Sequence, residues 1–515
     1  MITQLNQLFL NCTQFKTLNL SNWNTMGANN MHKTFSDCGQ LTSIIGVNSW
    51  DVSNVTNMAR MMEGCWHLTN LDALSAWDTK KVQNLSYAFS GCPRLSNLDF
   101  LSNWNVSNVK NVAYMFYIDE LSVEATTSTV SNLKALANWD VSNWNTIGDM
   151  FCYYRGLKTL EGLENWNTSN ITNMSGAFDC GYDSLLTNIN AVANWNVSKV
   201  KDFSQMFADV TNQDWNVISH WNTSNAQNFR RMFYRCNGNS IKFVSNWDTN
   251  NATSYQQMFY DWYALKSCDG VENFCLTKLE PNGIQGMFDR CRIKNTMALS
   301  NWDIYNSNIN SLASFFSDGD GVNLSGLANW NVSKITNLSA FIGSASGVNL
   351  FYLKDWDTSN VKDFSRMCFQ SYVEDIDLTY LQNWNMKSAV NLENMFFDCD
   401  VTNASCLKNW NTNNVENIRS MFLNCRNLSN IQGLESWNVK KVKNCANMFG
   451  RCNKLTSSSL KTLSNMLLNM NINASYKNAN NMNSRSPLYR SNKQLNTSTI
   501  GSTLVTALTS NGWTL

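Results

Sequence analysis

Tryptophan recurs along this chain at an almost constant interval, and this recurrence constrains the fold more than any other feature. Fifteen tryptophans follow one another at steps that are nearly all 26 to 29 residues, and Phe274 stands where one further member is expected. A period of this length indicates one small unit stacked many times, because a single unit cannot bury its own apolar face. We refer to these residues as the column tryptophans: Trp23, Trp50, Trp77, Trp104, Trp139, Trp166, Trp195, Trp221, Trp247, Trp302, Trp330, Trp356, Trp384, Trp410 and Trp437.

The repeated unit has a clear pattern, as in residues 41–65, LTSIIGVNSWDVSNVTNMARMMEGC. The L-x-x-L segment before each Trp predicts a strand that pairs in parallel with its copies. The apolar residues after Trp follow the spacing of one face of a short helix, as at Val55, Met58, Met61 and Met62. The sequence therefore predicts an α/β solenoid, a leucine-rich-repeat-like right-handed stack of about 16 strand–helix repeats with the tryptophans inside.

The residue after each column tryptophan is Asp or Asn, as at Asp51, Asp78 and Asn105. Short polar side chains at such places accept hydrogen bonds from free backbone N–H groups, so they start a helix or shape a turn. They are also spread one per repeat, which suits a ladder of local bonds better than a catalytic pair. We assign them to local structure.

The pattern divides the chain into two parts. Residues 1–455 form the predicted repeat solenoid, whose first coil begins in the middle of a repeat, and residues 456–515 depart from the consensus. Within the second part, residues 460–471 predict an amphipathic helix, residues 472–496 an irregular polar segment, and residues 497–515 another short helix. We expect residues 456–515 to be a partly helical cap over the last repeat.

Two irregularities interrupt the repeat. The step from Trp104 to Trp139 is longer than its neighbours, and its surplus in residues 120–131 predicts a loop that projects from the stack. Further tryptophans stand outside the column register. They are better candidates for exposed contact residues than the column tryptophans. These off-register residues are Trp66, Trp144, Trp215 and Trp262.

Nine of the sixteen cysteines share one position in the repeat and are expected to form a ladder. Neighbouring rungs about 5 Å apart could just reach disulfide distances, but a parallel stack favours free buried thiols because it does not orient the Cβ atoms for bonding. Cys268, Cys275, Cys406 and Cys445 lie off this register and either pair or stay free. The ladder cysteines are Cys12, Cys38, Cys65, Cys92, Cys236, Cys291, Cys399, Cys425 and Cys452.

Composition and motifs restrict the chemistry. The net charge is +1 and only 15% of residues are charged, which argues against a nucleic-acid partner. No stretch is long and apolar enough to predict a membrane span, and no signal peptide or anchor is visible. The histidines, His32, His67 and His220, lie in different repeats. We therefore predict no enzymatic activity, no cofactor and no metal site.

The segments SNWNVSNVKNVAYMF (residues 102–116) and SAWDTKKVQNLSYAFSGC (residues 75–92) resemble the BspA-like leucine-rich repeat surface proteins of low-GC bacteria and mycoplasmas. That family repeats W-[DN]-[TV]-S-N-V-x-N-M-x-x-M-F-x-x-C, and the similarity extends over most of the chain. The resemblance implies a bacterial or phage source, a place at the cell surface, outside the cell or on a virion, and a role in adhesion.

The segment before each Trp offers outward side chains that are mostly hydroxyls and amides, which suit hydrogen bonding to a glycan or a protein. We predict a non-enzymatic surface or attachment protein that binds a macromolecular partner, a host protein or glycan, through an elongated repeat face. The alternative is a structural spacer or a fibre or scaffold segment, including a phage tail or virion component, with end-to-end self-association through the N-terminal coil. The residues predicted to form the binding face are Thr17, Thr42, Thr69, Asn70, Asp72, Ser96, Asn97, Thr159, Ser429 and Asn430.

Overall fold

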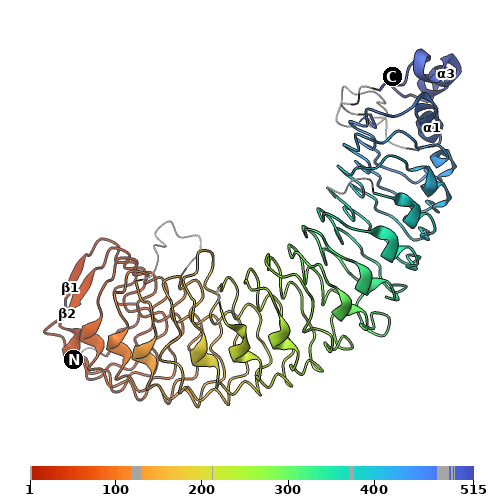
Figure 1. The fold of residues 1–515 in the computed structure, drawn as a ribbon. Coiled ribbons are helices and arrows are strands. Elements are labelled where there is room, and N and C mark those ends of the chain that lie inside the picture. Colours follow the sequence, from red (N-terminus) through yellow and green to blue (C-terminus); the bar gives the residue numbers. More distant parts are fainter. Residues whose placement is uncertain are drawn as a thin grey trace. The chain divides into compact units, whose positions relative to one another are not determined.

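The computed structural model describes residues 3–118, 129–211, 213–370, 376–471, 486–488, 491 and 493–515. They fall into two compact units: unit 1 comprises Met1–Gly238 with Phe243–Ala252, and unit 2 comprises Asn239–Lys242 with Thr253–Leu515. In each unit the chain winds through successive coils that place equivalent segments side by side (Figure 1). The predicted boundary after residue 455 differs from this division and stays a prediction. Most of the predicted loop at 120–131 and of the polar segment at 472–496 lies outside the described residues.

Regular secondary structure is sparse in the described ranges. Most coils contribute one 3-10 helix that ends within three residues of the column tryptophan. In chain order the elements are β1 (Thr17–Asn19), β2 (Ser43–Ile45), η1 (Val47–Ser49), η2 (Asp72–Leu74), η3 (Asp99–Leu101), η4 (Lys134–Leu136), η5 (Asn190–Val192), η6 (Trp215–Ile218), η7 (Lys242–Val244), η8 (Met297–Leu299), η9 (Ser325–Leu327), η10 (Leu350–Leu353), η11 (Leu378–Leu381), η12 (Ser405–Asn409), η13 (Leu434–Ser436), α1 (Ser457–Leu468), α2 (Thr497–Ile500) and α3 (Ser502–Ser510).

The strand predicted before each Trp is present only in shortened form. β1 and β2 pair in parallel, and among the later coils three pairs keep a single parallel bridge at the same repeat position: Thr159 with Asn188, Ser267 with Asn295 and Asn403 with Asn430. The parallel strand pairing ends at this repeat position because a polar side chain there accepts a hydrogen bond from the backbone N–H two residues later. The Asn70 Oδ1 accepts a hydrogen bond from the Asp72 N–H at 2.7 Å. Such a bond bends the chain into a turn, and a 3-10 helix follows where the strand would have continued.

The prediction of a helix after each Trp is wrong. The backbone N–H groups of this segment donate to carbonyls of the next coil as often as to carbonyls of their own coil. The Met58 N–H donates to the Asn84 carbonyl of the next coil at 2.9 Å, whereas the Met61 N–H donates to the Met58 carbonyl at 3.3 Å. Two residues of the coil, four positions apart, take left-handed backbone: Arg60 (φ 56°) and Gly64 (φ 72°). This winding buries the same apolar positions as a helix would, and so short a segment gains little from forming a helix alone.

The left-handed positions recur in nearly every coil and are mostly not glycine. Ala340, with φ 52°, is one of them. Left-handed backbone costs an L-residue about 1–2 kcal/mol, and glycine avoids that cost. We expect Ala340→Gly to raise the free energy of unfolding by about 1 kcal/mol and Ala340→Val to lower it, both measured by urea denaturation. Equal stability of the glycine and valine variants would contradict the left-handed assignment.

The column tryptophans line the interior of each unit. From Trp50 onward they are 2 to 5% exposed, whereas Trp23 is half-buried. In unit 1 the rings of Trp50 and Trp77 are stacked, with centroids 6.4 Å apart and planes within 4°. From Trp77 to Trp437 the indole nitrogens donate to backbone carbonyls of the preceding coil, as Trp77 does to Val47 at 2.8 Å, whereas the buried Trp50 nitrogen has no partner among the described residues. The column therefore joins neighbouring coils by ring contact and by hydrogen bond.

The off-register tryptophans are not exposed contact residues, and that prediction is wrong for three of them. Trp144, Trp215 and Trp262 are at most 4% exposed, and Trp66 is partly buried. Trp144 takes the repeat position that Val55 occupies in its own coil, and Trp262 takes that of the ladder cysteines. These positions face the interior, so a large ring there fills the core.

The ladder cysteines bond across coils. The Cys65 thiol donates to the Phe35 carbonyl at 3.1 Å, and the equivalent bond recurs from Cys38 to Cys452. The sixteen cysteines, all of them among the described residues, form no disulfide bonds. Burial raises the pKa of the Cys38 thiol to about 11, which keeps that thiol protonated at neutral pH. The ladder position therefore serves as a small buried donor at a tight corner.

This arrangement predicts selective thiol chemistry. Cys12 and Cys275 are only partly buried. We expect iodoacetamide at pH 8 to modify them well before the ladder thiols of Cys65 and Cys92, because the thiolate is the reactive species and burial excludes the reagent. Peptide mass spectrometry of the native protein gives the order, with the guanidinium-unfolded chain as the control in which all cysteines react. Equal native rates for Cys65 and Cys275 would contradict the ladder.

Residues beyond the last repeat cover the end of unit 2. Helix α1 overlaps the helix expected over residues 460–471 and packs against η13, α2 and α3. The Ser459 hydroxyl donates to the Ser429 carbonyl at 2.8 Å and accepts from the Ile431 N–H at 3.1 Å. The Trp513 indole nitrogen donates to the Leu467 carbonyl at 3.2 Å. The helix thus replaces the missing next coil as a hydrogen-bond partner.

Candidate ligand-binding groove

Two rows of outward side chains run along each unit beside the column tryptophans. The residue five places after Trp is buried, and the residues four and six places after Trp point outward, as Asn108 and Lys110 do on either side of buried Val109. Alternation of this kind is typical of extended backbone. We call these two sets the groove rows. In unit 1 they comprise Asn54, Thr56, Lys81, Gln83, Asn108, Lys110, Asn143, Asn145, Asn170, Thr172, Lys199, Lys201, Asn225, Gln227 and Asn251.

Hydrogen bonds between coils hold these side chains in place. The Asn108 Nδ2 donates to the Lys80 carbonyl of the preceding coil at 2.8 Å, and the Asn143 Nδ2 donates to the Ser107 carbonyl at 2.8 Å. The amide nitrogen is thereby fixed to the backbone, and the amide oxygen remains an acceptor. Lysine one coil on uses that acceptor, because the Lys199 Nζ donates to the Asn170 Oδ1 at 2.7 Å.

A hollow lies between the two rows in unit 1. Its volume is about 430 Å³. Amides, one hydroxyl and one ammonium line it, and apolar side chains do not. This chemistry suits a polar ligand more than an apolar one. The lining residues are Ser107, Asn108, Lys110, Asn143 and Asn145.

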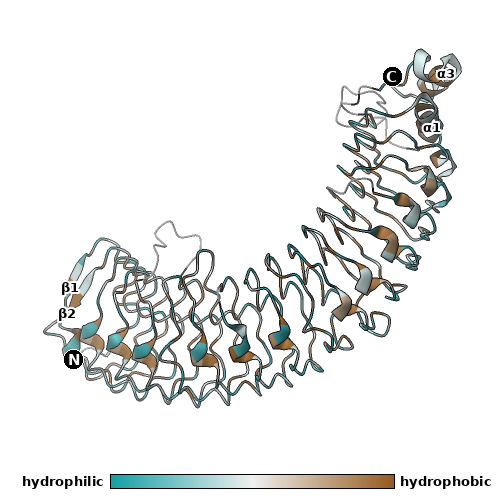
Figure 2. Ribbon diagram, viewed as in Figure 1, coloured by the Kyte–Doolittle hydropathy of each residue, from teal (hydrophilic) through white to brown (hydrophobic). Residues whose placement is uncertain are grey.

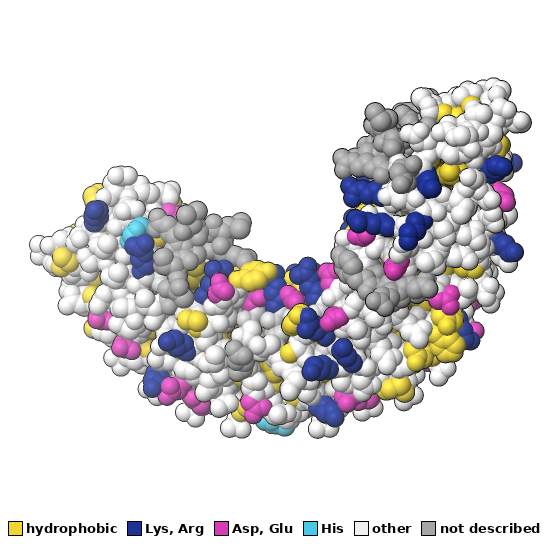
Figure 3. All heavy atoms as spheres, turned by 45° about the horizontal axis from the view of Figure 1, so that its top comes forward, with side chains coloured by type: hydrophobic (Ala, Val, Ile, Leu, Met, Phe, Trp, Pro, Cys, Tyr) yellow, Lys and Arg dark blue, Asp and Glu magenta, His cyan; other side chains and the backbone are white. Residues whose placement is uncertain are grey.

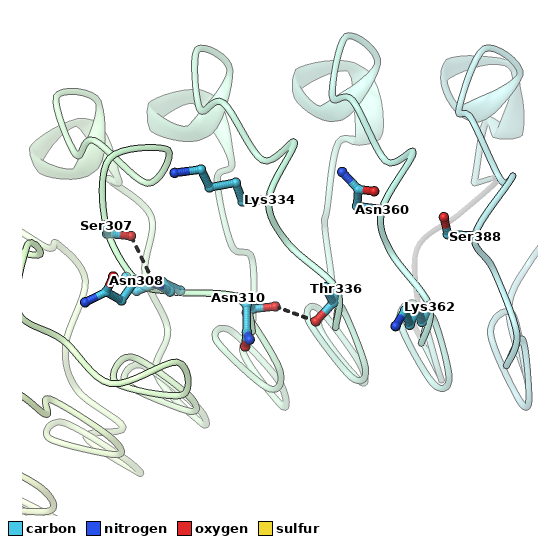
Figure 4. Close-up of a pocket in the computed structure, with 9 residues that line it drawn as sticks. Ser307, Asn308, Asn310, Lys334, Thr336, Asn360, Lys362 and Ser388 are labelled. Atoms are coloured by element: carbon cyan, nitrogen blue, oxygen red, sulfur yellow. Dashed lines mark hydrogen bonds between the residues drawn. The ribbon is translucent and has the colours of Figure 1, made fainter.

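Unit 2 has a hollow at the same repeat position, with a volume of about 550 Å³. Figure 4 shows Lys334, Asn360 and Ser388 as one row and Asn310, Thr336 and Lys362 as the other. The Thr336 hydroxyl donates to the Asn310 carbonyl at 3.2 Å, which fixes that wall. The Lys334 ammonium lies 4.3 Å from the ring centroid of Tyr305. The groove is therefore a feature of the repeat and not of one coil.

Charge along the groove rows is uneven. The chain has nearly equal numbers of basic and acidic residues, 39 and 38. The groove rows of unit 1 nevertheless contain four lysines and no carboxylate. In unit 2 the hollow has Lys334 and Lys362 among its lining residues, again without a carboxylate. Elsewhere the groove rows of unit 2 contain Glu280 and Glu416, and Glu416 pairs with Lys443 at 2.6 Å. The two hollows therefore carry local positive charge.

The surface as a whole is dominated by neutral groups. Figure 3 shows Lys and Arg side chains set among broad areas of uncharged polar atoms on the face in view. The lysines of the groove rows thus lie among amides and hydroxyls.

Six residues of the binding face predicted from the sequence are exposed and four, Asn97, Thr159, Ser429 and Asn430, are partly buried. The stack uses many of the hydroxyl groups of this face. The Thr42 hydroxyl donates to the Lys16 carbonyl at 2.8 Å, and the Ser96 hydroxyl donates to the Thr69 carbonyl at 3.0 Å. The hydroxyl of Thr17 lies 3.2 Å from that of Ser43. The Thr159 hydroxyl accepts from its own turn, and the Ser429 hydroxyl donates to the Thr402 carbonyl.

The amides of that face have similar local roles. The side-chain oxygens of Asn70, Asn97 and Asn430 each accept a backbone N–H two residues on. The Asp72 carboxylate accepts from Asn70. Eight of the ten residues belong to unit 1, and a small cavity of about 190 Å³ includes Ser96 and Asn97 in its lining. The predicted face remains a prediction, and its groups, like those of the groove rows, bond largely within the stack.

Unit 1 contains a cluster of tyrosines that was not predicted from the sequence. The Arg60 guanidinium lies 4.1 Å from the Tyr87 ring centroid, and Tyr87 stacks on Tyr114 at 4.7 Å. Burial and the nearby Asp149 carboxylate raise the pKa of the Tyr114 hydroxyl. These rings are half-buried and packed on one another, so the cluster contributes to the contact between coils. The signal was present as aromatic residues at one shared repeat position.

Two further classes of feature are missing from the part of the chain that the structure describes. No group of three or more His, Cys, Asp or Glu side chains is placed to hold a metal ion. No helix there has the length and apolar character needed to cross a membrane.

Fold and groove together define a tandem-repeat protein whose surface consists of rows of equivalent side chains. Comparison with protein families gives the same class. The chain belongs to the family described as "Mycoplasma protein of unknown function, DUF285". The overlapping matches cover residues 3–127, 63–159, 118–189, 152–269, 282–377 and 368–489. No curated protein matches the chain.

Solved structures with some likeness include a plant receptor and a bacterial leucine-rich repeat protein. The plant peptide hormone receptor RGFR1 in complex with RGF2 has a TM-score of 0.23 and 10% identity, covering 90% of this chain and 78% of that chain. A leucine-rich repeat protein from Bacteroides ovatus has a TM-score of 0.23 and 13% identity, with coverages of 88% and 80%. The TLR13–ssRNA13 complex has a TM-score of 0.21 and 10% identity, with coverages of 83% and 64%. TM-scores this low carry no argument, and the resemblance to BspA-like proteins stays a prediction.

Proposed function

We propose that this chain is a non-enzymatic binding protein, displayed on a cell or virion surface, that holds an elongated macromolecular partner in the groove. One observation carries the proposal. A hollow at the same repeat position occurs in both units, lined in each by exposed amides, hydroxyls and lysines. A partner that runs along a unit meets equivalent groups in successive coils.

Repetition supports binding of a chain rather than of a small molecule. Neighbouring coils in the groove rows are joined by parallel backbone bonds, such as that from the Lys110 N–H to the Gln83 carbonyl at 2.8 Å. Parallel segments of this kind lie about 4.8 Å apart. Each site contributes little by itself, but an extended partner engages many sites at once and gains affinity from the linkage. A glycan fits this pattern best, with an extended protein segment as the alternative.

The groove can be tested by filling it with a large side chain at positions where no hydrogen bond between coils is lost. Neither the Asn145 nor the Ser388 side chain makes a described hydrogen bond, and each lines a hollow. We expect Asn145→Trp combined with Ser388→Trp to abolish binding of ligands found by screening the intact chain on a glycan array and against host proteins. The control, Asn103→Trp with Asn301→Trp, places the same rings at exposed positions outside the groove rows. Unchanged binding by the blocked variant would overturn the groove as the site.

Surface display is tested separately. Trypsin added to intact producing cells or particles, followed by mass spectrometry, is expected to release peptides of this chain without lysis. Full protection while the interior stays sealed would overturn display and turn the search to internal partners or to an assembly role.

A further inference from the structure

We propose that the groove binds a linear acidic polysaccharide, whose carboxylate or sulfate groups pair with the groove-row lysines while its hydroxyls bond to the amides between them. This inference rests on the proposed function and names the class of partner. It goes beyond a general preference for polar ligands, because it assigns the charge of the ligand.

The first argument is the segregation of charge. Acidic residues are about as frequent as basic residues in the chain, yet the fifteen groove-row positions of unit 1 contain none of them. Lys81, Lys110, Lys199 and Lys201 all lie in these rows and are exposed. Carboxylates elsewhere in the unit often pair with lysine or arginine, as Glu161 does with Lys134 at 3.0 Å. The groove-row lysines of unit 1 have no carboxylate within their own rows, so the rows can attract an anion from outside the chain.

The second argument is that neutral groups orient some of these ammonium groups. The Lys81 Nζ donates to the Asn54 Oδ1 at 2.8 Å, and the Lys199 Nζ donates to the Asn170 Oδ1 at 2.7 Å. In unit 2 the Lys441 Nζ bonds to the Asn414 Oδ1 at 2.6 Å in the same way. An amide acceptor holds the ammonium in place without forming an ion pair with it, although the Asp51 carboxylate lies close enough to Lys81 for the charge of Lys81 to lower the pKa of that carboxylate. Such a lysine loses less side-chain freedom when an anion binds.

The third argument concerns the two walls. Lys199 and Lys201 belong to one coil and stand in different groove rows. Lys334 and Lys362 likewise stand on different walls of the hollow in unit 2 (Figure 4). An anionic group lying between the rows is thus within reach of ammonium groups from both sides. Amides and hydroxyls fill the remaining positions, which matches a polymer with hydroxyls between its charges.

Charge density favours a polysaccharide over a nucleic acid. Duplex DNA carries one negative charge per about 1.7 Å of its axis, whereas the groove rows of unit 1 contain four lysines over a series of coils about 4.8 Å apart. Sparse lysines separated by amides suit a polymer with about one charge or fewer per coil step.

The test uses the full chain and two polymers with the same sugar backbone, one charged and the other neutralised by a methyl ester on each carboxyl group. Oligomers of polygalacturonate are compared with the same oligomers fully methyl-esterified, by titration calorimetry at low and at high salt. We expect the esterified form to bind at least about tenfold more weakly, and added salt to weaken only the acidic form. Heparin oligomers form a second arm, which separates sulfate from carboxylate recognition. Duplex DNA is the competing polyanion.

A charge-matched pair of variants places the effect in the groove. The groove variant is expected to bind polygalacturonate or heparin about tenfold more weakly, and the control variant within about twofold of the original chain. Circular dichroism and thermal melting check that both remain folded. The groove variant combines Lys→Gln at Lys81, Lys110, Lys199, Lys201, Lys334 and Lys362. The control combines Lys→Gln at Lys16, Lys33, Lys134, Lys158, Lys408 and Lys461, which lie outside the groove rows.

The outcomes separate this inference from the proposed function. Equal binding of acidic and esterified oligomers, equal binding by the two lysine variants, or tighter binding of DNA than of either polysaccharide would overturn the acidic-polysaccharide assignment. Failure of both acidic polymers to bind would overturn it as well. In each case the blocked Asn145→Trp and Ser388→Trp variant still decides whether the groove binds another ligand.

Discussion

Replacing Trp330 by alanine is expected to lower the free energy of unfolding by about 3–5 kcal/mol. Trp330 is 4% exposed, and its ring stacks between Trp302 at 6.2 Å and Trp356 at 6.5 Å. Its indole nitrogen donates to the Leu299 carbonyl at 2.8 Å. Truncation opens a cavity, interrupts the column and leaves that buried carbonyl without its partner, so the loss exceeds that of an ordinary core residue. Urea denaturation followed by circular dichroism measures it.

Trp330→Phe is the matched control, because it keeps a stacked ring and removes the indole donor. We expect a smaller loss of about 1–3 kcal/mol. Phe274, which is 6% exposed at the equivalent place in its own coil, indicates that a phenyl ring fits this position. An alanine variant within about 1 kcal/mol of the original chain would contradict the column as a main source of stability.

Replacing Asp179 by asparagine is expected to stabilise the protein at pH 8 by about 1–3 kcal/mol, with the gain disappearing near pH 4. Asp179 is 3% exposed, and burial together with the nearby Asp209 raises the pKa of its carboxyl to about 7. The Gly181 N–H and the Gln205 side chain donate to it. Asparagine retains an acceptor for one of these donors and carries no charge.

The sign follows from proton linkage. The folded carboxyl holds its proton more tightly than the unfolded carboxyl, so the protonated group favours folding at low pH. That contribution falls as pH rises from the unfolded pKa through about 7. Denaturation at a series of pH values should show the two proteins diverging over this range. Asp51→Asn is the control, because hydrogen bonds from Ser53 lower the pKa of Asp51 and reverse the direction. A pH-independent effect of Asp179→Asn would contradict the buried-acid assignment.

The sequence predicted those features of the fold that a single side chain determines. The tryptophan period predicts a tandem repeat, and the family match supports this. The Asp or Asn after Trp shapes a turn, since the Asp51 Oδ1 accepts the Ser53 N–H at 3.0 Å. The backbone between these points was harder to predict. Buried positions at helical spacing also arise from a chain with two left-handed residues per coil, four places apart. Most of those residues, such as Arg60 and Ala340, are not glycine, so the sequence does not mark them.

The candidate site was harder to predict than the backbone. Hydrogen-bond partners on a neighbouring coil determine which polar side chains remain available to a ligand, and the sequence does not show those partners. Thr42 and Asn108 look equally available for ligand binding in the sequence. In the structure the Thr42 hydroxyl donates its only proton to a carbonyl of a neighbouring coil, whereas Asn108 uses its side-chain nitrogen and its side-chain oxygen remains an acceptor. End-to-end association through residues 8–20 stays a prediction. Leu8 and Phe15 there are 42% and 50% exposed.

The hydrogen bond from the indole nitrogen of a column tryptophan is accepted by a backbone carbonyl, that of Val47 for Trp77 and that of Leu299 for Trp330. Every residue type offers that carbonyl, and each indole nitrogen from Trp77 to Trp437 donates to one, although the Trp50 nitrogen does not. Duplication or loss of a whole repeat by unequal recombination therefore keeps the stack intact and changes its length. The reach of the protein can evolve in steps of one repeat, by copy number rather than by point substitution.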